Sequence, residues 1–112
     1  MGIKKSIRIK PEEVRELGFA TIAAGYKAIG DQLEFPSHLL YIQNLTDASV
    51  WISFDGQTDH FPLVAGSFLL LDITSNKSNQ IGFFIAEGTT FYAKQLGVPT
   101  SGSVYVTSFY GS

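Results

Sequence analysis

Over residues 39–73 the chain consists of three apolar stretches divided by short polar turns, with no helical stripe. That pattern is typical of β-strands. From Val50 to Phe54 apolar and polar residues alternate, which predicts a half-buried strand with Trp51 on its outer or partner-facing side. Residues 39–45 carry apolar side chains on both faces and predict a central strand. The continuous apolar run over residues 67–73 predicts a strand buried on both faces.

Turn signals divide the rest of the chain in the same way. Asp55-Gly56 predicts a tight hairpin turn, and the polar residues 74–80 predict an exposed loop before strands over 81–86, 89–96 and 103–110. Pro11, followed by two acidic residues, predicts one short helix over 11–17. Strands spaced by about 8 to 12 residues, with no long helix between them, predict an all-β fold. We expect an antiparallel jelly-roll-like β-sandwich of seven or eight strands, with an extended N-terminal arm and at most one short helix.

Length and composition favour one domain with a largely neutral surface. A chain of 112 residues has the size of a single domain, so we expect a basic arm over residues 1–10 and a β-sandwich domain over 11–112. Charged residues make up 16%, against about 25% in typical proteins, which suits a protein packed against neighbours. Without cysteine there is no disulfide and no thiolate zinc site. No apolar run reaches the length of a membrane span or of a signal-peptide core, so no membrane partner is expected.

The charges are unevenly distributed along the chain. Four of the eight basic residues, Lys4, Lys5, Arg8 and Lys10, lie in the first ten positions, and all ten acidic residues follow them. A basic segment of this kind is more commonly a solvated, mobile terminus, and contact with an acidic partner surface is the functional alternative. Because the remainder of the chain is acidic and repels phosphates, we expect no nucleic-acid partner.

The best candidate for a chemical site is the segment from Asp55 to His60, which gathers two carboxylates and one imidazole. It lacks the intermediate acids and the terminal glutamate of a calcium loop. The one other histidine, His38, precedes a different strand, so a zinc site is not expected either. We interpret Asp55 as the hairpin turn, Asp59 as a loop cap and His60 as a half-exposed residue at a strand end. No metal and no cofactor is expected.

No other motif indicates catalysis. The chain has no nucleophile elbow and no phosphate loop, and the glycosylation pattern Asn44-Leu45-Thr46 is interpreted as an ordinary turn. We therefore expect a protein that is not an enzyme, and a small hydrolase or a cupin-like metal enzyme remains a minor alternative. Five aromatic residues are candidates for a sugar-stacking platform or for core and interface packing: Tyr41, Trp51, Tyr92, Tyr105 and Tyr110.

Three segments resemble small virion proteins of tailed bacteriophages: IQNLTDASVWISFDGQTDHFPL, AGSFLLLDITSNK and FYAKQLGVPTSGSVYVTSFYG, which together lie between residues 42 and 111. The resemblance includes capsid stapling or cement (decoration) proteins, which are jelly-roll modules bound in many copies to the outside of the capsid. It implies a structural protein of the virion, made in the host cytoplasm and bound to coat or other virion proteins. A neck or tail component, or a glycan-binding attachment module, is the alternative.

Such a role requires surfaces that hold neighbouring subunits, and we expect a homo-oligomer. The basic arm would lie on an acidic coat surface, and the strand over 103–110 would add to a neighbour's sheet. The predicted partner contacts are therefore Lys4, Lys5, Arg8, Lys10, Trp51 and Tyr110.

Overall fold

The computed structural model describes residues 9–72 and 85–111, and their fold is all-β, as predicted. Within these ranges the one helical segment is a 3₁₀ turn, η1 (Phe19–Thr21). The described strands are β1 (Ile9–Pro11), β2 (Arg15–Gly18), β3 (Lys27–Ala28), β4 (Leu39–Asn44), β5 (Val50–Ser53), β6 (Phe61–Leu63), β7 (Phe68–Asp72), β8 (Tyr92–Gln95) and β9 (Ser103–Gly111).

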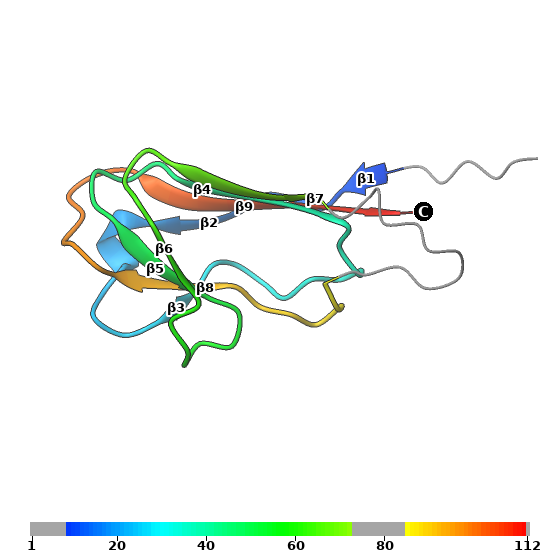
Figure 1. The fold of residues 1–112 in the computed structure, drawn as a ribbon, viewed down its shortest axis with the longest axis horizontal. Helices are drawn as coiled ribbons and strands as arrows, with labels where there is room; N and C mark the ends of the chain where they lie inside the picture. Colours follow the sequence, from blue (N-terminus) through cyan, green and yellow to red (C-terminus); the bar gives the residue numbers. More distant parts are fainter. Residues whose placement is uncertain (1–8, 73–84, 112) are drawn as a thin grey trace, which may run out of the picture.

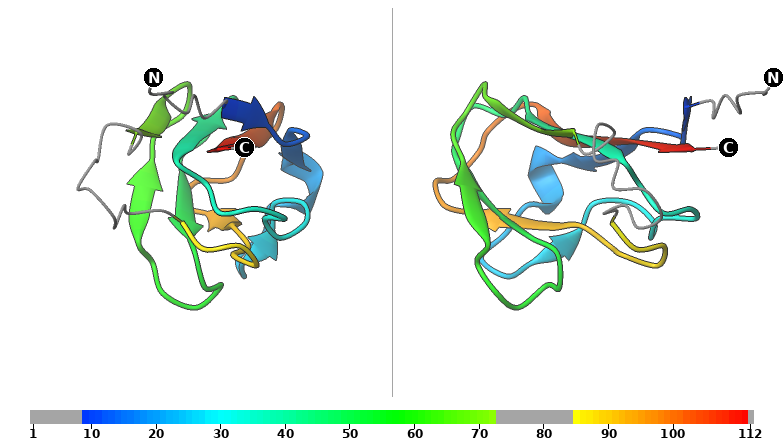
Figure 2. Two further views of the ribbon diagram at one scale, coloured as in Figure 1. Left: turned by 90° about the vertical axis from the view of Figure 1, so that its right-hand side faces the viewer. Right: turned by 45° about the vertical axis from the view of Figure 1, so that its right-hand side comes forward.

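The strands form two antiparallel sheets that lie one above the other (Figure 1). In the first sheet β1 and β2 both pair with β9, which is followed by β4 and then by β7 at the edge. The second sheet has the order β3-β8-β5-β6. The further views show the same two layers facing each other, an arrangement compatible with the predicted β-sandwich (Figure 2).

The pairing between strands is nested along the chain. β5 pairs with β6, β4 with β7, β3 with β8 and β2 with β9, all antiparallel. The chain thus doubles back on itself as one long hairpin with its tip between β5 and β6. Three further antiparallel pairings, of β1 and β4 with β9 and of β5 with β8, complete the sheets.

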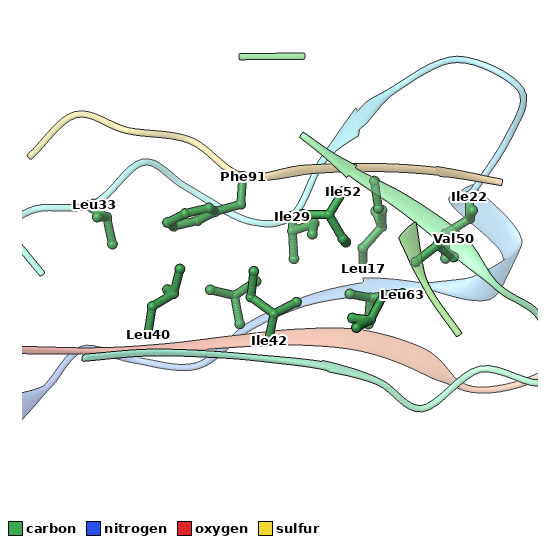
Figure 3. Packing of buried hydrophobic residues seen from close by; sticks show 13 residues of the cluster. Leu17, Ile22, Ile29, Leu33, Leu40, Ile42, Val50, Ile52, Leu63 and Phe91 are labelled. Atoms are coloured by element: carbon green, nitrogen blue, oxygen red, sulfur yellow. The ribbon is translucent and has the colours of Figure 1, made fainter. Parts of the chain in front are cut away.

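Alternate side chains of the two sheets meet in one hydrophobic core (Figure 3). Leu40 and Ile42 of β4 point towards Phe91 and Ile29, which come from the opposite layer, and all four are completely buried. Val104 and Val106 of β9 and Val50 and Ile52 of β5 are equally buried, as the period of two in a strand requires. The central position predicted for β4 is confirmed, because this strand pairs with β7 on one side and with β9 on the other.

Three predictions about strands and local structure are wrong. The described residues form nine strands, not the seven or eight expected. The helix expected over residues 11–17 is replaced by β2, in which Arg15 and Leu17 are buried and Glu16 is exposed. Pairing with β9 provides the strand ladder and overrides the local helix signal. β7 is not buried on both faces, because Phe68 and Leu70 are exposed at the edge of the sheet. The loop predicted over 74–80 and most of the strand predicted over 81–86 lie outside the described residues.

Candidate functional site

Three of the six predicted contact residues lie in the described part of the chain, and they divide between the two sheets. Lys10 of β1 and Tyr110 of β9 are directly opposite each other in the strand register. Trp51 belongs to β5 in the other sheet, where its register partners are Pro62 and Lys94. Lys4, Lys5 and Arg8 lie outside the described residues. The structure therefore brings Lys10 and Tyr110 together and places Trp51 in a different layer.

The outer face of the first sheet carries a band of large apolar side chains. These residues alternate with the core residues of β4, β7 and β9 and therefore point away from the core. Phe68 is 59% exposed and Leu70 is 50% exposed. The rings of Tyr41 and Phe68 meet edge to face at 5.4 Å between centroids. We call this surface the apolar face, and its residues are Leu39, Tyr41, Phe68, Leu70, Tyr105 and Phe109.

The apolar face has the properties of a contact surface. Tyr41 lies opposite Leu70 and Leu39 lies opposite Phe109 in the register, whereas Gln43 lies between Phe68 and Tyr105. Adjoining exposed apolar side chains on a protein surface mark sites of association. β7, at the margin of this face, has β4 as its one strand neighbour among the described residues, so its other side is a sheet edge.

The apolar face was not predicted from the sequence, because an unbroken apolar run is compatible with two different structural environments. Such a run fits a strand covered on both sides, and it fits equally well a strand whose outer side meets a partner. The available signal was the lack of any polar residue between Phe68 and Leu71. An ordinary half-exposed strand would carry polar residues at alternate positions.

A buried ion pair lies beside the first sheet. Arg15 donates from Nη2 to Oε1 of Glu12 at 2.6 Å, and the two side chains are only 8% and 5% exposed. The guanidinium also donates to the backbone carbonyls of Asp31 and Gln32. The carboxylate of Glu12 in turn accepts the backbone N–H of Phe35 at 3.1 Å. These contacts fasten the segment over residues 31–35 to the start of β2.

Beside this ion pair lies an open pocket of about 440 Å³. One wall is aromatic, because Phe35 stacks on Tyr110 with ring centroids 4.1 Å apart and an interplanar angle of 15°. The remaining lining includes four acidic residues, three of them exposed, and one cation, Arg15. We call it the acidic pocket, and its lining includes Glu13, Val14, Asp31, Glu34, Phe35 and Tyr110.

The segment from Asp55 to His60 lies in the loop that joins the antiparallel strands β5 and β6, so the predicted hairpin is confirmed. The tight turn expected at Asp55-Gly56 is wrong, because residues 54–60 all lie between the two strands. The carboxylate of Asp55 accepts hydrogen bonds from the backbone N–H groups of Thr58 and Gln57 and from the hydroxyl of Ser53. These bonds hold the pKa of Asp55 well below its usual range. Nδ1 of His60 accepts the backbone N–H of Phe54 at 3.0 Å. Within residues 9–72 and 85–111, no three metal-ligating side chains gather.

Asp59, predicted to cap this loop, instead joins it to the second sheet. Its Oδ1 accepts the phenol hydroxyl of Tyr26 at 2.5 Å and lies 3.1 Å from Nζ of Lys94. The ammonium group of Lys94 also lies 4.8 Å from the centre of the Tyr26 ring. Since Lys94 is opposite Trp51 in the register, two aromatic side chains and an ion pair share the outer side of this sheet.

Comparison with protein family models, with curated proteins and with solved structures finds no match to this chain. None of the helical structure in the described ranges has the length and hydropathy needed to cross a membrane.

Proposed function

We propose that this chain is a non-enzymatic structural protein of a tailed-bacteriophage virion. Its most specific role would be that of a capsid cement or stapling protein, bound in many copies to coat subunits. It would form homo-oligomers on the particle and bind neither nucleic acid nor membrane. The observation that carries this function is the apolar face, where Phe68 and Leu70 are exposed side by side with Tyr41.

The physical requirements of a cement protein support this reading. Such a protein binds subunits that are already assembled, so it needs a preformed surface that gains free energy when covered. The strand ladder holds the backbone of Tyr41, Phe68 and Leu70 in place, so no backbone freedom is lost when a partner covers them. Repetition on a symmetric shell then converts weak individual contacts into firm attachment.

We also propose a jelly-roll topology for the fold. A jelly roll is an eight-stranded double sheet containing two Greek keys. It arises when a long antiparallel hairpin is rolled up, so that its paired strands alternate between two sheets. The nested pairs support this, because β2·β9 and β4·β7 lie in the first sheet while β3·β8 and β5·β6 lie in the second. β1 would then be an addition beside β2 at the margin of the first sheet.

The location in the virion is tested with particles of the phage that carries this gene. Mass spectrometry of purified particles should detect the chain in a fixed ratio to the coat protein, and imaging of labelled particles should place it on the capsid. A label at the neck or tail would favour the alternative position. Absence of the chain from purified particles would contradict a structural role.

The use of the apolar face is tested with the double variant Phe68→Asp/Leu70→Asp. Recombinant protein is added to particles that lack it, and the bound fraction is measured by co-sedimentation. We expect the double variant to lose binding, because two carboxylates would be buried without partners. Val98→Asp is the matched control, since Val98 is 73% exposed but lies outside the apolar face. Equal binding by the double variant and the control would contradict this contact.

A glycan-binding attachment module is the second candidate, favoured by the arrangement around Trp51. Aromatic rings stack on sugars, and Lys94 and Asp59 supply charged groups on the same side of the second sheet. Under this alternative Trp51→Ala would abolish binding in a glycan array, whereas Tyr105→Ala, on the opposite sheet, would preserve it. Absence of binding by the unmodified protein, or no effect of Trp51→Ala, would count against it.

A further inference from the structure

We propose that the acidic pocket binds the basic N-terminal segment, residues 1–8, of a second copy of the chain. This contact between copies rests on the structural role proposed above, where it supplies the link between neighbouring subunits. It uses a surface separate from the apolar face, so one subunit could hold the particle and a neighbour at the same time.

The pocket carries negative charge that no described partner neutralises. Glu12 is committed to Arg15 and to backbone N–H groups. Glu13, Asp31 and Glu34 are exposed, and among the described residues their carboxylates make no ion pair. The charge of Arg15 is balanced by that of Glu12, so it does not offset the three exposed carboxylates. The rim is therefore suited to a cationic ligand.

The pocket also offers apolar surface. Val14 is 53% exposed and Phe35 is 41% exposed, and both line the cavity together with Tyr110. The stacked pair of Phe35 and Tyr110 presents aromatic rings to a lysine or arginine side chain, which they attract through cation–π interactions. A ligand that combines positive charge with aliphatic side chains would match both parts of the lining.

The N-terminal segment has this combination. Its sequence is MGIKKSIR, with three cations, no acid and two isoleucines. Lys4, Lys5 and Arg8 would face the exposed carboxylates, while Ile3 and Ile7 would cover Val14 and Phe35. The complementary charges are all in one protein, which makes association of identical copies possible.

The strand register favours a second copy over the segment's own pocket. Ile9 lies opposite Gly111 and Pro11 lies opposite Phe109, so the segment before Ile9 joins β1 at the C-terminal end of β9. Pro11 itself lines the pocket, so to enter its own pocket the segment would have to turn back immediately before β1. Eight extended residues span about 27 Å, which is enough to reach a neighbouring subunit.

The test is a charge exchange between two variants. One variant carries Lys4→Glu, Lys5→Glu and Arg8→Glu in the segment, and the other carries Glu13→Lys and Glu34→Lys in the pocket. We expect each variant alone to self-associate at least about tenfold more weakly than the unmodified chain in sedimentation velocity, because like charges then meet. The equimolar mixture should regain association, and added salt should weaken it. Circular dichroism verifies that each variant is folded.

Two controls separate this contact from the others. Glu87→Lys makes one such charge reversal at an exposed residue outside the pocket lining, and it should leave association unchanged. The charge exchange is repeated with Phe68→Asp/Leu70→Asp in both partners, which removes association through the apolar face. A folded pair of variants that fails to associate when mixed would overturn the proposed contact, as would a monomeric unmodified chain.

Failure of this contact between copies can be distinguished from failure of the proposed virion role. If the mixture associates but the chain is absent from particles, the contact between copies stands and the virion role falls. If both charge variants enter particles as efficiently as the unmodified chain and the mixture does not associate, the virion role stands and this contact falls.

Discussion

The guanidinium of Arg15 and the carboxylate of Glu12 form an ion pair at 2.6 Å in which both side chains are almost completely buried. Backbone carbonyls of Asp31 and Gln32 surround the guanidinium, and backbone N–H groups of Glu34 and Phe35 reach the carboxylate. The pair thus joins two segments that are well separated in the sequence. It also forms the inner side of the acidic pocket.

Glu12→Gln should lower the free energy of unfolding by about 3 kcal/mol, because it leaves a buried guanidinium without its counter-charge. Urea denaturation of the purified protein measures this change. Glu13→Gln is the matched control, since Glu13 is exposed, and it should shift the free energy by no more than about 0.5 kcal/mol. Equal stability of the two variants would show that the ion pair does not anchor the segment over 31–35.

Gly102→Ala should destabilise the protein much more than Gly66→Ala, although both glycines have a positive φ, of 89° and 79° respectively. A Cβ at Gly102 would overlap the carbonyl oxygen of Leu45, whereas a Cβ at Gly66 would meet nothing within 4 Å. We expect a loss of about 1 kcal/mol at Gly66 from backbone strain alone and at least about 3 kcal/mol at Gly102. Thermal and urea unfolding of both variants give the comparison, and similar losses would contradict the steric explanation.

Strands in which apolar and polar residues alternate could be predicted from the sequence. The alternation arises because one face of such a strand lies in the core and the other faces outward. Val50 and Ile52 are buried while Trp51 between them is not, as the pattern indicates. The hairpin loop at Asp55 could also be predicted from the sequence, because its carboxylate accepts hydrogen bonds from the backbone of the next few residues. Local chemistry therefore sufficed where the partners of a residue are its neighbours in sequence.

The parts of the fold and of the candidate site that could not be predicted depend on contacts between residues that are far apart in the sequence. Pro11 and Glu12 give a helix-start signal, but Glu12 binds the backbone of Phe35 and the strand ladder of β2 comes from β9. The acidic pocket combines residues 11–15 and 30–35 with Tyr110, three separate segments whose proximity only the fold determines. Likewise, sequence alone does not distinguish an apolar strand that is covered on both faces from one such as β7, whose outer face is exposed.

The stability of the β5–β6 loop should decrease in acid. Hydrogen bonds to the carboxylate of Asp55 lower its pKa in the folded state, so they contribute stability above the unfolded pKa of about 3.9. That contribution is lost as the pH falls below this value and towards the folded pKa. Asp55→Asn should therefore flatten the acid side of a plot of unfolding free energy against pH between about pH 5 and pH 2. Gln57→Ala, the control in the same loop, removes no titratable group and should keep the acid-side slope of the unmodified protein. An unchanged slope in Asp55→Asn would contradict a stabilising role of the Asp55 carboxylate.

Tyr26 should ionise at a higher pH than an unperturbed tyrosine does. Burial raises the pKa of Tyr26, and the hydrogen bond to Asp59 and the charges of Asp59 and Asp55 raise it further. Because the folded-state pKa is raised, the stabilisation is complete below the unfolded pKa of about 10 and is lost as the pH rises through the folded-state pKa. Tyrosinate absorbance measured against pH should show a late phenol, which Tyr26→Phe removes and Asp59→Asn shifts to lower pH. A late phenol that survives Tyr26→Phe would mean that the contact with Asp59 does not hold in solution.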